Sequence, residues 1–297
     1  MKINSKEVIQ NRLGYFELAQ KPSEGELQQY YAEKYYQYEH SNYAKTYPED
    51  ELKYFRAKIA QKYLALKSLS GSESGSLLDV GCGEGFTLAF FKEMGWQVTG
   101  VDYSRFGCQQ MNPHCLDDLL AGDIYLILHQ LIEQHKTYDL LWISNVLEHV
   151  LDPLALLRTL QKLVSPAGYL IVQVPNDFSF FQNYLLQAKI ISEPFWVAVP
   201  DHISYFTRTS LKRLCLEAGW SEQLVLADFP IDLFLLNEHS NYHHAPEKGK
   251  AAHLARVKLE NLFHAHSPER TNRFYQAMAE LDFGRQITGF YTLKPLN

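Results

Sequence analysis

A glycine-rich turn between an apolar run and a helix-like stretch constrains the fold of this chain more than any other feature. Residues 77–85 read LLDVGCGEG, with glycine at positions 81, 83 and 85. Glycine lets a strand turn sharply and lets a ligand approach the backbone, because no Cβ is in the way. The helix predicted over residues 86–94 presents unpaired N–H groups to this turn. The spacing is G-x-G-x-G rather than the G-x-G-x-x-G of dinucleotide sites, and Glu84 within it favours a ligand with an amino acid group over a pyrophosphate.

Apolar strands alternate with helices after this turn. We predict further strands at residues 97–102, 138–144, 168–175, 221–229 and 285–293, and helices at 126–135, 153–163 and 209–218. Buried strands alternating with helices predict an α/β fold, with a doubly wound, mostly parallel sheet covered on both faces. Such a sheet binds ligands at the carboxyl ends of its strands. Asp102 ends the second strand, where a carboxylate can accept both hydroxyls of a ribose.

The chain divides into a front region and one α/β domain. Residues 1–67 are predicted to form a helical N-terminal cap, and residues 68–297 the domain, with an aromatic insertion at 177–206 and a polar one at 231–284. Ten of the 19 tyrosines lie in the first 63 residues. Tyr31 and Tyr35 are spaced i, i+4, which places both on one side of a helix. We predict that they close over the site and contact the substrate; simple packing on the flank of the sheet is the alternative.

The composition excludes several classes of protein. A net charge of −6 and a pI of about 6.1 argue against a nucleic-acid binder. The four cysteines show no paired spacing, which favours reduced thiols in a cytoplasm. The first ten residues lack the apolar stretch of a secretion signal, and no apolar run approaches the ~18 residues of a membrane span. We therefore predict a cytoplasmic protein with no membrane span and no nucleic-acid partner.

Residues 77–104, read as strand, D-x-G-x-G-x-G turn, helix, strand and acid, resemble the nucleotide-binding half of class I S-adenosylmethionine-dependent methyltransferases. The resemblance implies a seven-stranded Rossmann-like sheet, S-adenosyl-L-methionine as cofactor and S-adenosyl-L-homocysteine as product. Residues 138–176 continue it, and the residues after the fourth strand are expected to face the methyl group. The expected cofactor contacts are Asp79, Gly81, Cys82, Gly83, Gly85, Asp102, Tyr103, Ser104, Asp123, Ile124, Asn145 and Val146.

The motif H-x-x-Y-F-T at residues 202–207 is similar to the methyltransferases grouped as domain family 23, and in particular to members from bacterial polysaccharide and natural-product gene clusters. That similarity implies a small-molecule acceptor, and a sugar or sugar nucleotide is the leading candidate. Histidine has the right pKa to take a hydroxyl proton. We predict His202 as the base, His149 as the second candidate and Tyr205 as a positioning group; a buried histidine that bridges the insertion to the sheet is the alternative for His202. The expected substrate contacts are Glu148, Asn176, Phe178 and Trp196.

Two histidine features raise the question of a metal. Some quinone-biosynthesis O-methyltransferases of this fold hold a divalent metal with an acid-x-x-Glu-His cluster, but the first position is Asn145 in this chain. Six of the twelve histidines lie between residues 239 and 266, a segment without cysteine. We predict no metal at either place, and a lid or homodimer contact for the second segment. A quinone-like or aromatic O-methyltransferase, and an idle cofactor-binding regulatory subunit, remain the alternative functions.

Overall fold

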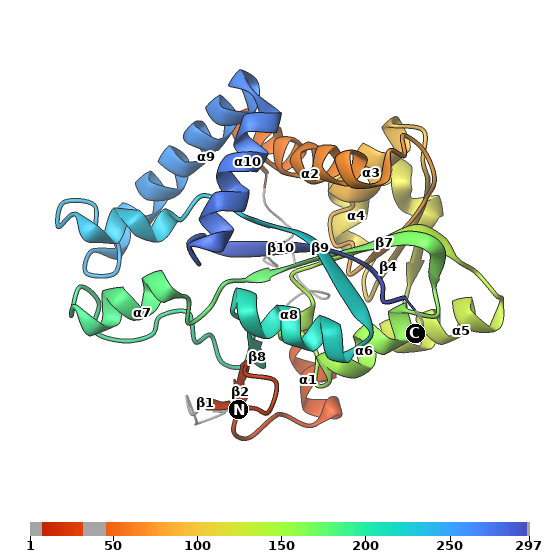
Figure 1. The fold of residues 1–297 in the computed structure, drawn as a ribbon, viewed down its shortest axis with the longest axis horizontal. Coiled ribbons are helices and arrows are strands. Elements are labelled where there is room, and N and C mark those ends of the chain that lie inside the picture. The colour runs from red at the N-terminus through yellow and green to blue at the C-terminus, as the bar shows by residue number, and fades with distance from the viewer. Residues whose placement is uncertain (1–7, 32–45, 296–297) are drawn as a thin grey trace.

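The computed structural model describes residues 8–31 and 46–295, and its centre is a seven-stranded sheet (Figure 1). The strand order is β5-β4-β3-β6-β7-β10-β9. The first five strands are parallel, and β10 lies antiparallel between β7 and β9. This confirms the predicted mostly parallel Rossmann-like sheet. The strands are Ser76–Val80 (β3), Gln97–Asp102 (β4), Leu119–Ala121 (β5), Tyr138–Ser144 (β6), Val164–Pro175 (β7), Trp220–Ala227 (β9) and Gln286–Leu293 (β10).

Helices cover both faces of the sheet, because both faces carry apolar side chains that must leave water. One face packs against α2, α3 and α10, with α9 outside them, and the other against α5, α6 and α8. Figure 1 shows these two layers above and below the strands. The helices are Glu49–Ser70 (α2), Phe86–Glu93 (α3), Phe106–Met111 (α4), Ile124–Glu133 (α5), Pro153–Leu160 (α6), Arg208–Glu217 (α8), Gly249–His266 (α9) and Pro268–Glu280 (α10), and two short 3₁₀ helices are Pro113–Asp118 (η2) and Leu147–His149 (η3).

The described part of the front region is not wholly helical. It begins with a hairpin of β1 (Val8–Gln10) and β2 (Phe16–Leu18), followed by α1 (Glu24–Tyr31) and α2. Strand β2 pairs with β8 (Ser204–Tyr205) in the first insertion, so the two form one small sheet. The front of the chain is therefore joined by backbone hydrogen bonds to the segment that carries the predicted base.

The two insertions lie at the same end of the molecule (Figure 1). The first contains α7 (Phe180–Gln187) and forms a small apolar cluster with Leu235 from the second. The second contains η4 (Ile231–Leu236), η5 (Pro246–Lys248), α9 and α10. Helix α9 packs along α2, where Nζ of Lys58 lies 2.8 Å from Oε2 of Glu260 and Nε2 of His253 lies 2.9 Å from Oε1 of Glu51. No helix among the described residues is both long enough and apolar enough to cross a membrane.

Candidate active site

The glycine turn lies at the carboxyl end of β3, in the middle of the sheet, and its backbone requires glycine. Gly81, Gly83 and Gly85 have φ of 75°, 52° and 76°, in the left-handed region that residues with a Cβ rarely adopt. A Cβ on Gly81 would lie 2.4 Å from Cγ2 of Val146, just after β6. The turn thus lies directly against the segment after β6, which brings two predicted cofactor segments together.

Asp102 ends β4 beside this turn, and its carboxylate holds the turn in place. Oδ2 accepts the N–H of Gly83 at 2.8 Å, and Oδ1 accepts the N–H of Ser104 at 3.0 Å. Burial raises the pKa of Asp102, and these N–H groups act in the opposite direction. Because a carboxylate oxygen accepts two hydrogen bonds, each oxygen can still accept a hydroxyl from a ligand. This geometry suits the ribose role predicted for Asp102.

Four other predicted cofactor residues lie along the same edge of the sheet. Cys82 is buried within the turn, and the Tyr103 side chain is exposed after β4. Asp123 caps α5, where its Oδ1 accepts the N–H of Leu126 at 3.0 Å. Ile124, the first residue of that helix, is buried. Asp123 therefore has a helix-capping role in addition to its predicted contact with the cofactor.

Asp79, at the start of the turn, is influenced by the buried amine of Lys62, which the sequence did not indicate. The Asp79 side chain is 3% exposed, and burial, with nearby Asp102, raises its pKa to about 8 while Lys62 acts to lower it. Lys62 comes from α2 and lies 5.2 Å from the centre of the Trp142 ring. Burial lowers the pKa of Lys62 to about 7. Helix α2 thus brings a buried amine, which titrates near neutral pH, close to Asp79.

A tyrosine from the front of the chain contacts the same turn. The hydroxyl of Tyr47 lies 3.0 Å from Oε1 and 3.2 Å from Oε2 of Glu84. The Tyr47 ring packs edge-on against Phe55 of α2 and lies 6.2 Å from Phe86 at the start of α3. The sequence indicated a tyrosine-rich cap, but it did not single out Tyr47 as the residue that reaches the turn.

The two histidines predicted as bases lie side by side near the carboxyl end of β6. The ring centres of His149 and His202 are 5.0 Å apart, and Nε2 of His149 lies 3.9 Å from Oε1 of Glu148. Nδ1 of His149 lies 2.6 Å from the carbonyl oxygen of Asp201. A carbonyl only accepts, so Nδ1 carries the proton and Nε2 the lone pair in the neutral ring.

Glu148 is the buried acid of this cluster. Its side chain is 1% exposed, and Oε2 has no hydrogen-bond partner among the described residues. Burial, with a smaller contribution from Asp177 and Asp201, raises the pKa of Glu148 to about 8. The group therefore keeps its proton at neutral pH until a ligand, cation or base changes its surroundings.

These three residues are also the set that could hold a metal. One ligand atom from each of Glu148, His149 and His202 lies within 4.8 Å of the others. Among the described residues, the histidine-rich segment contains no comparable set. There His253 pairs with Glu51, and burial lowers the pKa of His264 to about 4. The sequence predicted no metal because of Asn145, and it did not include His202 as a third group; the absence of a metal stays a prediction.

The other predicted acceptor residues lie in the first insertion and are mostly enclosed. The hydroxyl of Tyr205 donates to the carbonyl oxygen of His202 at 3.0 Å. The ring of Phe178 stacks on Phe16 of β2 at 4.2 Å and meets Trp196 edge-on at 5.5 Å. Trp196 is 1% exposed, so its ring belongs to the apolar cluster of the insertion.

Asn176 and two tyrosines complete the predicted set. Nδ2 of Asn176 donates to Oδ1 of Asp282 at 3.2 Å, and its buried Oδ1 has no partner among the described residues. Tyr31 is the last residue of α1, and Tyr35 lies outside the described residues. The predicted contact of these tyrosines with substrate therefore remains a prediction.

The residues around the turn fit the expected cofactor. The three glycines leave the backbone of the turn without Cβ atoms, Asp102 keeps acceptor capacity for hydroxyls, and the Tyr103 ring is exposed at the same edge. A methionine moiety along the turn and a ribose at Asp102 are the groups that these features suit.

The comparisons with known proteins bear on this edge of the sheet. Residues 51–223 match the family model described as "Methyltransferase domain". A protein named ubiquinone biosynthesis O-methyltransferase from Vibrio cholerae is 31% identical over 167 residues, 53% of this chain and 66% of that protein. A protein of the same name from Rhodopseudomonas palustris is 33% identical over 110 residues, 37% of this chain and 44% of that protein. The chain thus matches less than two thirds of the length of either curated relative.

Solved structures give a weaker likeness. A methyltransferase from Archaeoglobus fulgidus, described as dependent on S-adenosylmethionine, aligns with a TM-score of 0.47 and 19% identity, over 79% of this chain and 93% of its own.

Proposed function

The chain belongs to the methyltransferase domain family, and from that membership we propose that it transfers the methyl group of S-adenosylmethionine to an oxygen of a small molecule. The cluster of Glu148, His149 and His202 near the carboxyl end of β6 carries this proposal. An oxygen nucleophile gains most from a base that takes its proton as it attacks. A cluster of two histidines and one acid, beside the turn that suits the cofactor, meets that need.

The chain's own residues align the reactants and accept the proton. The cofactor, when bound, supplies a methyl group on a sulfonium that is displaced in line. His149 is the stronger candidate for the base, because the carbonyl of Asp201 fixes the tautomer in which Nδ1 carries the proton. His202 lies next to it, where it can orient the acceptor or share the proton. Glu148 can then stabilise the imidazolium that forms.

A hydroxyl-rich acceptor, a sugar or sugar nucleotide, suits the polar atoms around this cluster best. Oε2 of Glu148, Oδ1 of Asn176 and Oδ2 of Asp177 are buried without a hydrogen-bond partner among the described residues. Buried polar atoms normally have partners. Several ligand hydroxyls would provide them.

A catechol or quinone-like acceptor is the second candidate. The observation that favours it is the name of the curated relatives, ubiquinone biosynthesis O-methyltransferase, although the match covers 66% or less of their length. Phe178 and Trp196 already pack against other aromatic rings, so they give little support for stacking on an aromatic acceptor.

Transfer of a tritiated methyl group from S-adenosylmethionine tests the proposal. Nucleoside-diphosphate sugars and catechol are the two acceptor sets, each assayed with and without EDTA. Label in the sugars supports the first candidate, and label in catechol the second. Binding of S-adenosylhomocysteine without transfer to either set would favour the idle regulatory subunit, and loss of turnover with EDTA would assign a metal to the cluster.

A further inference from the structure

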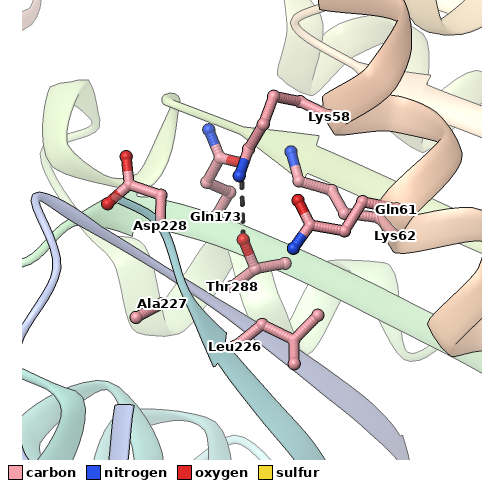
Figure 2. Close-up of a pocket in the computed structure, with 8 residues that line it drawn as sticks. All are labelled: Lys58, Gln61, Lys62, Gln173, Leu226, Ala227, Asp228 and Thr288. Atoms are coloured by element: carbon pink, nitrogen blue, oxygen red, sulfur yellow. Dashed lines mark hydrogen bonds between the residues drawn. The ribbon is translucent and has the colours of Figure 1, made fainter. Parts of the chain in front are cut away.

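A polar cavity lies between α2 and the strands β7, β9 and β10. It is lined by Lys58, Gln61, Lys62, Gln173, Leu226, Ala227, Asp228 and Thr288, and several of these side chains point toward one another (Figure 2). Its volume of about 10 Å³ has room for about one water molecule. The cavity is therefore too small for an acceptor or a cofactor. Its polar side chains, however, begin a series of hydrogen bonds that extends beyond the cavity.

Three hydrogen bonds lead from this cavity to the edge where the cofactor is expected. The hydroxyl of Thr288 donates to Oε1 of Gln173 at 3.4 Å, as Figure 2 shows. Nε2 of Gln173 donates to Oε1 of Gln286 at 2.6 Å, and Nε2 of Gln286 donates to Oδ1 of Asn145 at 3.4 Å. Each amide accepts at its oxygen and donates at its nitrogen, so the chain of bonds runs in one direction and ends on Asn145.

Asn145 is held firmly at the end of this chain. Its φ of 54° is unusual for a residue with a Cβ, and its N–H donates to the carbonyl oxygen of Gln173 at 2.9 Å. Gln173 thus fixes both the backbone of Asn145 and, through Gln286, its side chain. With Oδ1 engaged, Nδ2 is the end of the amide left for a ligand, and it has no partner among the described residues.

We propose that Thr288, Gln173 and Gln286 are positioning residues that lock the Asn145 amide with Nδ2 toward the cofactor, where it donates to a carboxylate or hydroxyl oxygen. The inference rests on the proposed function, because Asn145 is assigned to the cofactor site. Reversing any one bond would turn Oδ1 toward the ligand, and an acceptor oxygen would then face an acceptor oxygen of the ligand. The two outer bonds are long, so each contributes modestly.

Gln286→Glu is the sharpest test, because the change is isosteric and its effect depends on protonation. A carboxylate at position 286 accepts from both Gln173 and Asn145 and therefore reverses the Asn145 amide. A protonated carboxyl donates to Oδ1 and restores the native direction. Calorimetric titration with S-adenosylhomocysteine should show roughly tenfold weaker binding than wild type at pH 8, with affinity recovering toward wild type at about pH 4, below the ordinary glutamate pKa of ~4.3. Gln286→Leu should be weaker at both pH values.

Gln223→Glu is the matched control, since Nε2 of Gln223 donates to Oγ1 of Thr292 at 3.1 Å in the same sheet but away from the site. It should bind S-adenosylhomocysteine as wild type does at both pH values. Thr288→Val removes only the first hydrogen bond and should weaken binding about threefold. It tests the same series of bonds if the variants at position 286 fail to fold. Wild-type affinity in folded Gln286→Glu and Thr288→Val at pH 8 would overturn the proposal. Absence of binding by the wild-type protein would instead overturn the proposed function.

Discussion

The site has a cofactor edge, formed by the glycine turn and Asp102, and an acceptor edge, formed around Glu148, Asn176 and Asp177. The two edges differ in whether the protein itself satisfies their hydrogen bonds. At the cofactor edge, backbone groups fix the polar side chain: both oxygens of Asp102 accept N–H groups from the turn and from the residues after β4. At the acceptor edge, Glu148, Asn176 and Asp177 each keep a buried atom without a partner among the described residues. The first edge is formed before its ligand binds, whereas the second needs a ligand to complete its hydrogen bonds.

His149→Ala is expected to give the largest effect, and it acts on the acceptor edge alone. Turnover with the acceptor found in the tritium assay should fall about 100- to 1000-fold, because the general base is lost. The dissociation constant of S-adenosylhomocysteine, measured by calorimetry, should stay within about twofold of wild type. His129→Ala, on an exposed turn of α5, is the control and should leave both unchanged.

His202→Ala decides which histidine is the base. The sequence ranked His202 first, whereas the fixed tautomer ranks His149 first. We expect His202→Ala to lower turnover by about tenfold, less than His149→Ala does. A larger loss in His202→Ala than in His149→Ala would restore the order derived from the sequence.

Asp102→Ala should weaken cofactor binding at the cofactor edge. The variant loses the carboxylate that accepts from Gly83 and from the expected ribose, so affinity for S-adenosylhomocysteine should fall about 100-fold. Asp118→Ala removes only a surface pair with Lys92, 2.6 Å away, and should bind as wild type does. Equal affinity of the two variants would show that Asp102 makes no contact with the ligand.

Glu148→Gln tests the cost of a buried acid through the pH dependence of stability. The folded-state pKa of about 8 lies above the usual carboxyl value, so the folded state holds the proton more tightly. The resulting stabilisation is complete at low pH and is lost as pH rises toward 8. Glutamine has no proton to lose, so the melting temperature of the variant relative to wild type should rise between pH 5 and pH 8, by about 3 °C.

Glu133→Gln, on an exposed part of α5, is the control for that experiment and should show no such trend. A difference between Glu148→Gln and wild type that is independent of pH would mean that Glu148 is ionised in the folded protein throughout this range.

Tyr47→Phe should have the smallest effect on cofactor affinity. It tests whether the hydrogen bond from Tyr47 to the glycine turn contributes to the cofactor edge. Phenylalanine keeps the ring packing against Phe55 but loses the hydrogen bonds to Glu84. We expect affinity for S-adenosylhomocysteine to fall about threefold, because the pair is partly exposed. Tyr63→Phe, which loses a bond to the carbonyl of Glu73 away from the turn, should change it by less than that.

The glycine turn and Asp102 could be predicted from the sequence, whereas the hydrogen bonds that hold Asn145 could not, for a physical reason. The turn and Asp102 depend on local backbone geometry, which glycine spacing and a strand end reveal directly. The pairing of Gln173 with Gln286 depends on how β10 lies antiparallel to β7, more than 100 residues away in the chain. A single sequence carries no signal for that register.

The front region shows the same limit. Its tyrosine content indicated a cap, but the sequence did not predict the hairpin of β1 and β2. In the structure this hairpin pairs with β8, which is far away in the chain. Helix α2 carries several lysines, and nothing in the sequence distinguished Lys62, which the structure buries near Asp79. Helix packing, which composition does not encode, decides which lysine is enclosed.

The place of β10 has a consequence for how the protein is made. This strand lies between β7 and β9, so those two strands are not hydrogen-bonded to each other in the finished sheet. While the ribosome is still adding residues before position 286, the growing protein exposes two open strand edges and the apolar faces beside them. Such edges invite pairing with other chains. Insertion of β10 between them, or binding of a chaperone, would protect these edges from aggregation.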